Sequence, residues 1–256
     1  RISGNDTKQK RTGQIHKPGR SHPRIPGLLL NLLYPPVCPF CGEIYKDGIC
    51  PDCRKKIIYI REPRCMRCGK PLQKETAEYC ADCRKRDSDV VQGRSLWLHQ
   101  DPVPGAVYRF KYHNRRCYGK LFAGEMALYY GPWIASKDIG VIIPVPLHPS
   151  RKRKRGFNQA EILAAVLSEQ TGIPVRKDVL FRIKKTKPQK TLDPGERRDN
   201  LKGAFAVSGR WKPCRNVLLI DDIYTTGSTI ERCAGMLKKA GAENVWFLTI
   251  SIGQGV

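Results

Sequence analysis

The 256-residue chain lacks several patterns that define common classes of protein. It has no G-x-x-x-x-G-K-[ST] sequence, which argues against a P-loop nucleotide site, and no G-x-G-x-x-G, the fingerprint of dinucleotide-binding folds. No apolar run reaches the roughly 20 residues of a membrane-spanning helix. Acidic residues are scarce: 23 Asp and Glu face 47 Lys and Arg, which gives a formal charge of +24. This excess favours polyanionic partners without choosing among nucleic acid, pyrophosphate and an anionic membrane surface.

The beginning of the chain carries little periodicity. Residues 1–27 are mostly basic and polar, and we expect a disordered tail there. The next apolar residues, 28–34, are expected to form a short helix that Pro35 ends. The apolar run 25–33 follows too long a basic stretch and precedes no small-residue cleavage site, so it does not fit a secretory signal peptide. We therefore expect a cytoplasmic protein.

Eight of the eleven cysteines form four C-x-x-C pairs, a spacing typical of metal ligands in a reducing compartment. Each such turn points two thiolates at one ion, so we predict two structural Zn²⁺ sites in a double zinc ribbon over residues 28–88. Pairing consecutive turns into tetrads is simplest because it closes short loops, and an interleaved arrangement remains open. A redox role is the alternative, which four copies disfavour. The predicted ligands are Cys38, Cys41, Cys50, Cys53, Cys65, Cys68, Cys80 and Cys83.

Residues 89–256 alternate between apolar runs and helical patterns, and we expect a second domain there. Helices are predicted at 121–130, 159–171 and 230–240, and strands at 95–99, 106–112, 139–144, 179–183, 217–220 and 244–252. Such alternation implies an α/β fold with a mainly parallel sheet flanked by helices. Residues 184–203 are polar and punctuated by Pro and Gly, as expected for a flexible loop.

The most informative segment is 217–230, in which four apolar residues lead into Asp221 and Asp222. A hydroxyl-rich loop and a helical pattern follow. Free backbone N–H groups at a helix N-terminus suit a phosphate, and open α/β sheets bind ligands at the carboxyl ends of their strands. The segment therefore predicts a ligand with one phosphate beside two hydroxyls or a metal ion. The candidate phosphate-binding residues are Thr225, Thr226, Gly227, Ser228 and Thr229.

This segment resembles the phosphoribosyl pyrophosphate (PRPP) motif of the type I phosphoribosyltransferases. The resemblance implies that Asp221 and Asp222 hold the ribose 2- and 3-hydroxyls, that the loop holds the 5-phosphate, and that Mg²⁺ bridges ribose and pyrophosphate oxygens. It also implies displacement of pyrophosphate from C1 of PRPP, usually by a nitrogen nucleophile, under a flexible catalytic loop at 184–203. A retained fold that binds PRPP without catalysis is the competing interpretation.

Five consecutive basic residues, 151–155, precede Gly156 in a predicted strand-to-helix loop. Alone they favour a solvated charge run or a nucleic-acid patch. Beside the PRPP motif they favour a pyrophosphate site at Arg155 and Gly156, with residues 151–153 facing outward. The triplet 155–157 is similar to the pyrophosphate loop of adenine phosphoribosyltransferases. Lys190 and Arg197, in the flexible loop, are expected to neutralise the departing pyrophosphate.

Three features stand in a fixed order before the PRPP motif: the cysteine module, an Arg-Gly-Phe-Asn-Gln loop, and a Thr-x-Pro-Gln…Arg-x-x-Asn-Leu-x-Gly-Ala-Phe segment. Over residues 28–252 this combination resembles the ComF family, competence proteins of bacterial DNA uptake. The resemblance implies a phosphoribosyltransferase whose acceptor is unidentified.

In the phosphoribosyltransferases that the chain resembles, a variable segment called the hood selects the acceptor. We expect the hood within residues 95–130, with Lys111 and Tyr112 facing inward. The alternative is a non-catalytic protein whose ribbons and basic charge bind single-stranded DNA or a competence partner. Its PRPP site would then be regulatory or vestigial.

Overall fold

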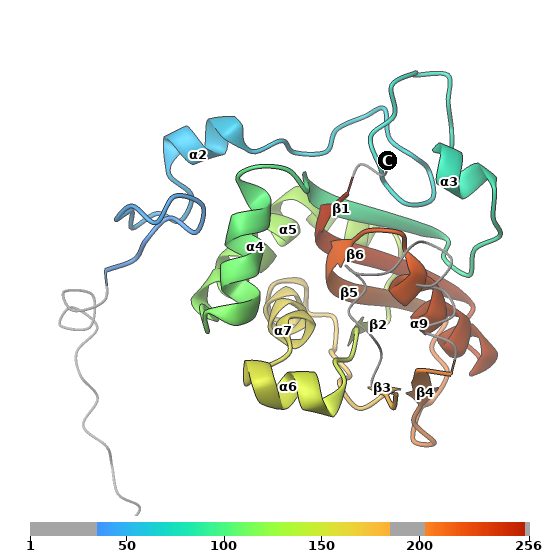
Figure 1. Ribbon diagram of the computed structural model, residues 1–256. Coiled ribbons are helices and arrows are strands. Elements are labelled where there is room, and N and C mark those ends of the chain that lie inside the picture. Colours follow the sequence, from blue (N-terminus) through green and yellow to red (C-terminus); the bar gives the residue numbers. More distant parts are fainter. Residues whose placement is uncertain (1–34, 185–202, 254–256) are drawn as a thin grey trace, which may run out of the picture. The chain divides into compact units, whose positions relative to one another are not determined.

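The computed structural model describes residues 35–184 and 203–253. Its main sheet has four parallel strands in the order β1 (Gln92–Leu98), β6 (Asn244–Ile252), β5 (Asn216–Tyr224) and β2 (Val141–Pro144) (Figure 1). Pro144 lies opposite Ile220 in the register. The residues that follow β2 and the acidic end of β5 are therefore brought to the same edge of the sheet.

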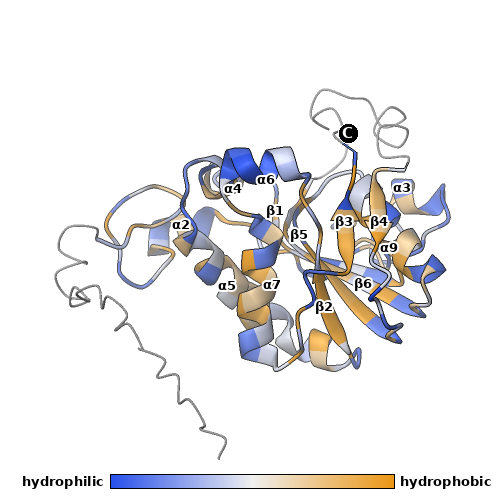
Figure 2. Cartoon of the chain, turned by 90° about the horizontal axis from the view of Figure 1, so that it is seen from below, coloured by the Kyte–Doolittle hydropathy of each residue, from blue (hydrophilic) through white to orange (hydrophobic). Residues whose placement is uncertain are grey.

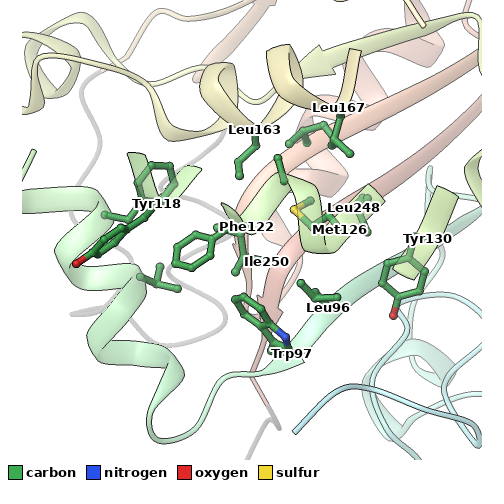
Figure 3. Close-up of a cluster of buried hydrophobic side chains, with 14 of the residues drawn as sticks. Leu96, Trp97, Tyr118, Phe122, Met126, Tyr130, Leu163, Leu167, Leu248 and Ile250 are labelled. Carbon is green, nitrogen blue, oxygen red and sulfur yellow. The ribbon is translucent and has the colours of Figure 1, made fainter. Parts of the chain in front are cut away.

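Both faces of the sheet are covered, which explains why its strands are nearly continuous apolar runs. Side chains of β5 alternate between the faces. Leu218 and Ile220 pack with α4 (Val103–Tyr112), α5 (Cys117–Ala135) and α7 (Gln159–Thr171). Val217 and Leu219 face α9 (Ser228–Lys239) on the other side. Figure 3 shows part of the first of these two cores, whose buried side chains include Trp97, Phe122, Leu163 and Leu248.

A second, antiparallel sheet consists of β3 (Leu180–Arg182) and β4 (Phe205–Val207). The predicted strand 179–183 is thus present, but it lies outside the parallel sheet. Its partner β4 falls beyond the predicted flexible loop. Leu180 and Phe205 are buried in the core on the α9 side. Within the part of the chain described here, no helix is both long enough and apolar enough to cross a bilayer.

The cysteine module packs on both faces of the sheet. Its short helices α2 (Pro51–Lys56) and α3 (Ala81–Arg84) each begin directly after the first cysteine of a pair. Cys38 and Cys53 belong to the core beneath α4 and α5, whereas Cys65 and Cys83 belong to the core on the α9 side. The described residues from 37 onward form one compact unit. The domain boundary near residue 88 stays a prediction.

The predicted strand at 106–112 is wrong, because these residues belong to helix α4. The segment alternates apolar and polar side chains over a short stretch, which fits a strand. The buried side chains, however, are Val103, Ala106, Val107 and Phe110, at the i, i+3, i+4 and i+7 positions of one helix face. Burial of these four side chains against the parallel sheet therefore favours a helix over a strand for this segment.

The basic run 151–155, predicted as a loop, forms most of helix α6 (Pro149–Arg155), which is mostly blue in Figure 2. His148 caps its N-terminus by accepting from the Ser150 N–H, and Pro149 opens the first turn. Gly156 ends the helix with φ of 79°, a left-handed conformation that glycine adopts without strain. The glycine thus serves as a helix C-cap.

Most other predicted elements match the structure. Helix α7 and strand β6 have the predicted bounds, and the predicted helix 121–130 lies inside α5. The α/β fold with a mainly parallel sheet and an N-terminal zinc-ribbon module is confirmed. The predicted tail, the helix at 28–34, Lys190 and Arg197 lie outside the described residues.

Candidate functional site

A cavity of about 200 Å³ lies at the carboxyl edge of the parallel sheet. Strand β5, the segment after β2, and helices α4 and α6 all contribute to its walls, although they are far apart in the sequence. The cavity therefore exists only in the folded chain. Its lining residues are Lys111, Val145, Pro146, Leu147, Arg151, Arg155, Arg182, Asp221, Asp222, Ile223, Thr225 and Thr229.

The two carboxylates at the end of β5 interact with each other and with a lysine. The backbone N–H of Asp222 donates to Asp221 Oδ1 at 2.8 Å. Removal from bulk water, followed by the nearby charge of Asp222, raises the pKa of Asp221 to about 7. Lys111 Nζ lies 2.9 Å from Asp222 Oδ1. Near neutral pH, Asp221 is thus poised between its charged and neutral forms, while Lys111 balances the charge of Asp222.

The loop after the carboxylates is held in a narrow turn. Gly227 has φ of 77°, and a Cβ there would collide with Tyr224 Oη, so only glycine fits. The hydroxyls of Thr226 and Ser228 lie 2.9 Å apart. The first turn of α9 leaves backbone N–H groups without intrahelical partners. The loop therefore has the donors and the positive dipole end that suit a phosphate.

Three arginines form another part of the cavity lining, called the cationic wall below. Arg155 Nη2 donates to Tyr112 Oη at 2.9 Å, and its guanidinium lies 4.7 Å from the centroid of that ring. Arg151 is partly buried, and burial together with the charge of Arg155 lowers its pKa. Arg182 is buried, and burial together with the charge of Arg151 lowers its pKa. The three guanidinium groups repel one another, and the charge of Asp221 offsets part of this repulsion at Arg182. A bound anion would offset more of it.

The structure brings together part of the predicted site. Asp221, Asp222, Thr225, Thr229 and Arg155 line one cavity. The inward orientation expected for Lys111 is also found, whereas Tyr112, expected to face inward beside it, is exposed and absent from the cavity lining.

Two side chains of the cationic wall differ from expectation. Arg151 was expected to face outward and instead lines the cavity, because α6 is helical and turns residues 151 and 155 to the same face. Arg182 had no distinguishing signal, since a single arginine in a short strand does not reveal where that strand packs.

The eight paired cysteines form two clusters, 38/41/50/53 and 65/68/80/83. In each cluster all four Sγ atoms lie within 4.8 Å of one another, and the described cysteines are free of disulfides. The Cys41–Cys50 and Cys68–Cys80 Sγ distances are both 3.7 Å. A tetrahedral ion with Zn–S bonds of about 2.3 Å has edges of about 3.8 Å, so both clusters fit Zn²⁺. Consecutive pairing of the C-x-x-C turns is confirmed.

Comparison with known proteins identifies the family. A model described as a double zinc ribbon domain matches residues 29–84. Competence protein F of Haemophilus influenzae is 34% identical over 208 residues, which cover 79% of this chain and 90% of that protein. This chain belongs to the ComF family. Competence protein ComFC of Bacillus subtilis is 30% identical over 214 residues, covering 80% of this chain and 84% of the relative.

Solved structures give looser matches. Orotate phosphoribosyltransferase from Aeropyrum pernix superposes with a TM-score of 0.34 and 17% identity, over 56% of this chain and 66% of that one. The glutamine PRPP amidotransferase from B. subtilis gives a TM-score of 0.33 and 23% identity over 53% of this chain, which spans only 25% of the amidotransferase. The assignment of the fold rests on the strand order of the sheet itself.

We predict that each cysteine tetrad binds one Zn²⁺, so elemental analysis of the purified protein should find close to two zinc ions per chain. Cys53→Ser and Cys83→Ser remove one ligand from different tetrads, and each should lose close to one equivalent. Cys117→Ser is the matched control, because this exposed cysteine belongs to neither tetrad. Two zinc ions retained in both tetrad variants would contradict the assignment.

Proposed function

We propose that this protein is a phosphoribosyltransferase that binds PRPP with Mg²⁺ and transfers phosphoribose to an unidentified acceptor, with release of pyrophosphate. The observation that carries the proposal is the convergence of the acidic pair, the hydroxyl-rich loop and a cationic wall on one cavity. We further propose a cytoplasmic role in DNA uptake. The names of the H. influenzae and B. subtilis relatives, both competence proteins, support that role.

Under this proposal, each part of the cavity would hold one part of PRPP. Carboxylate oxygens at Asp221 and Asp222 would accept hydrogen bonds from the ribose hydroxyls. The loop at residues 225–229 and the α9 N-terminus would hold the 5-phosphate. Arg151 and Arg155 would face the pyrophosphate. The wall would thus stabilise the charge that develops on the leaving group as its bond to C1 breaks.

The carboxylate oxygens also suit Mg²⁺, which in nucleotide enzymes is held by one or two carboxylates together with substrate phosphates. Bound Mg²⁺ would neutralise part of the pyrophosphate charge. The Lys111 ammonium, 2.9 Å from Asp222, provides positive charge at this position. Lys111 would therefore have to give up part of its contact with Asp222 when the metal and the ribose bind.

Binding of PRPP with Mg²⁺ should strengthen as the pH rises from 6 to 8. The pKa of Asp221 is about 7, so below pH 7 most molecules must lose a proton before this group can bind as a carboxylate. Each pH unit below that pKa should weaken binding by up to about tenfold. Titration calorimetry across this range, in buffers of different ionisation enthalpy, should also detect proton release.

Asp221→Asn tests the same group. The variant should bind PRPP at least about tenfold more weakly at pH 8 and lose the pH dependence. A carboxyl whose folded pKa exceeds its unfolded value destabilises the fold once it ionises, so the variant should melt no lower than wild type at pH 8. Asp178→Asn, which changes an exposed carboxylate paired with Arg176, is the control. Equal affinity of wild type and Asp221→Asn at pH 8 would refute the ribose contact.

Catalysis is tested separately from binding. Purified protein with PRPP and Mg²⁺ should release pyrophosphate in the presence of at least one member of a panel of nucleobases and amines. Tight PRPP binding without release across the panel would favour the competing function, a binding protein with a regulatory PRPP site.

A specific observation supports nucleic acid as a second ligand. On α6, Arg153 and Lys154 are exposed and absent from the cavity lining, whereas Lys152 is engaged by Glu161 at 2.8 Å. Neutralising Arg153 and Lys154 to Gln should weaken binding of single-stranded DNA and lower its salt slope by about 0.7 per lost phosphate contact. PRPP affinity should be unchanged.

Arg151→Gln is the matched variant from the same helix. It should weaken PRPP binding and leave DNA binding nearly intact. If the Arg153 and Lys154 double variant binds DNA with an unaltered salt slope, α6 is not a nucleic-acid contact.

A further inference from the structure

Each zinc ribbon is linked to one wall of the cavity by contacts that include an arginine side chain. The second tetrad is followed by Arg86, whose side chain contacts the loop proposed to bind phosphate. The first tetrad contains a backbone turn that is held by Arg109 of α4. None of the residues that line the cavity is a cysteine, so the tetrads can affect it only through the residues that lie between them.

The link from the second ribbon begins at its last cysteine. Arg67 Nη1 donates at 2.7 Å to the carbonyl oxygens of both Cys83 and Arg86. Arg67 belongs to the same C-x-x-C turn as Cys65 and Cys68. The position of the backbone at Arg86 therefore depends on the conformation of the second tetrad.

The side chain of Arg86 then fixes the loop itself. Its Nη1 donates to the carbonyl oxygen of Thr226 at 2.7 Å, and its Nη2 donates to Tyr224 Oη at 2.8 Å. The Tyr224 ring stacks on Phe247 of β6, with centroids 4.7 Å apart and planes 3° apart. In a trans peptide the carbonyl and the next N–H point in opposite directions, so holding the Thr226 carbonyl turns the Gly227 N–H away from Arg86.

The residues after Arg86 extend this contact to the first turn of α9. Ser88 Oγ donates to Glu231 Oε1 at 2.7 Å, and the Asp89 N–H donates to Glu231 Oε2 at 3.1 Å. The Arg86 guanidinium lies 4.0 Å from Glu231. The loop and the helix that follows it are thus both attached to the linker that leaves the second ribbon.

The first ribbon contacts the other wall. Arg109 Nη2 donates to the carbonyl oxygens of Pro39 at 2.6 Å and Phe40 at 2.9 Å, inside the first C-x-x-C turn. Arg109 lies two residues before Lys111, and Lys111 pairs with Asp222. The first ribbon therefore holds the end of α4 that carries the cation facing the acidic pair.

We propose that Arg86 and Arg109 are positioning residues through which the two zinc ribbons set the two walls of the PRPP cavity. Zinc loss at the second tetrad would release the loop at residues 225–229. Zinc loss at the first tetrad would release the end of α4 that carries Lys111. The identity of the ligand rests on the proposed function. The coupling between ribbon and wall is a property of the ligand-free protein.

Hydrogen exchange measured by mass spectrometry in the ligand-free full chain tests the coupling directly. Arg86→Gln should accelerate amide exchange at 224–232 and leave 109–113 unchanged. Arg109→Gln should do the reverse, and both variants should retain two zinc ions. Arg84→Gln and Arg115→Gln, which replace exposed arginines near each link, are the controls and should match wild type. Unchanged exchange at 224–232 in Arg86→Gln would overturn the proposal for the second ribbon, and unchanged exchange at 109–113 in Arg109→Gln would overturn it for the first.

The zinc ligands provide a crossed test. Cys83→Ser should reproduce the exchange pattern of Arg86→Gln, and Cys53→Ser that of Arg109→Gln. If a cysteine variant unfolds the sheet as well, the arginine variants decide. Arg86→Lys keeps the positive charge but cannot donate to both the Thr226 carbonyl and Tyr224 Oη in the same way. It should therefore recover only part of the protection of residues 224–232 against exchange.

Affinity is the second measurement. Arg86→Gln should bind PRPP with Mg²⁺ about tenfold to a hundredfold more weakly than wild type, since it loses charge-assisted contacts that order the loop. If wild type binds neither PRPP nor inorganic pyrophosphate, the proposed function fails, while the exchange pattern still decides whether the ribbons position the walls.

Discussion

Two adjacent carboxylates at the end of a buried strand are the constraint around which this structure is arranged. Removing Asp221 from water beside Asp222 raises its pKa to about 7, which records an electrostatic cost in the ligand-free protein. Lys111 offsets part of that cost at 2.9 Å from Asp222. The arginines of the cationic wall carry a cost of their own, because burial lowers the pKa of both Arg151 and Arg182. PRPP, the proposed ligand, would relieve both costs, because its ribose hydroxyls would donate to the carboxylates and its anionic groups would face the arginines.

The zinc ribbons belong to this arrangement as structural parts of the sheet domain. One tetrad packs into the core under α4 and α5, and the other packs into the core on the α9 side. Segments so poor in apolar residues could not hold such positions by their own hydrophobic burial, so metal coordination would supply much of their folding free energy. Phe40, in the first ribbon, meets Trp97 of β1 edge-on with centroids 5.3 Å apart. The ribbons therefore contribute to both hydrophobic layers as well as to the contacts at the cavity.

What the sequence predicts well is local. The segment from β5 to α9 could be recognised because its strand, acidic pair, loop and helix are contiguous, and the cysteine tetrads could be recognised because each closes a short loop. The sequence pattern is ambiguous wherever tertiary packing decides between a helix and a strand or sets the contacts of a side chain. The strand expected at 106–112 is helix α4, since its four buried positions match a helix face only when the sheet beneath it is known. Arg86 and Arg182 carry no motif, and their roles depend on which distant backbone each side chain meets.

The distribution of charge limits what PRPP alone can explain. Of the 47 Lys and Arg in the chain, the cavity lining includes Lys111, Arg151, Arg155 and Arg182, and it also contains two carboxylates. A site for one PRPP molecule thus accounts for little of the formal +24. Most of the surplus lies elsewhere, where like charges repel one another and a bound polyanion would relieve that repulsion. Within α6 the division falls between neighbouring residues: the helical period turns Arg151 and Arg155 to the cavity and leaves Arg153 and Lys154 exposed. Under the two proposals, one short helix would serve PRPP on one face and a longer polyanion on the other.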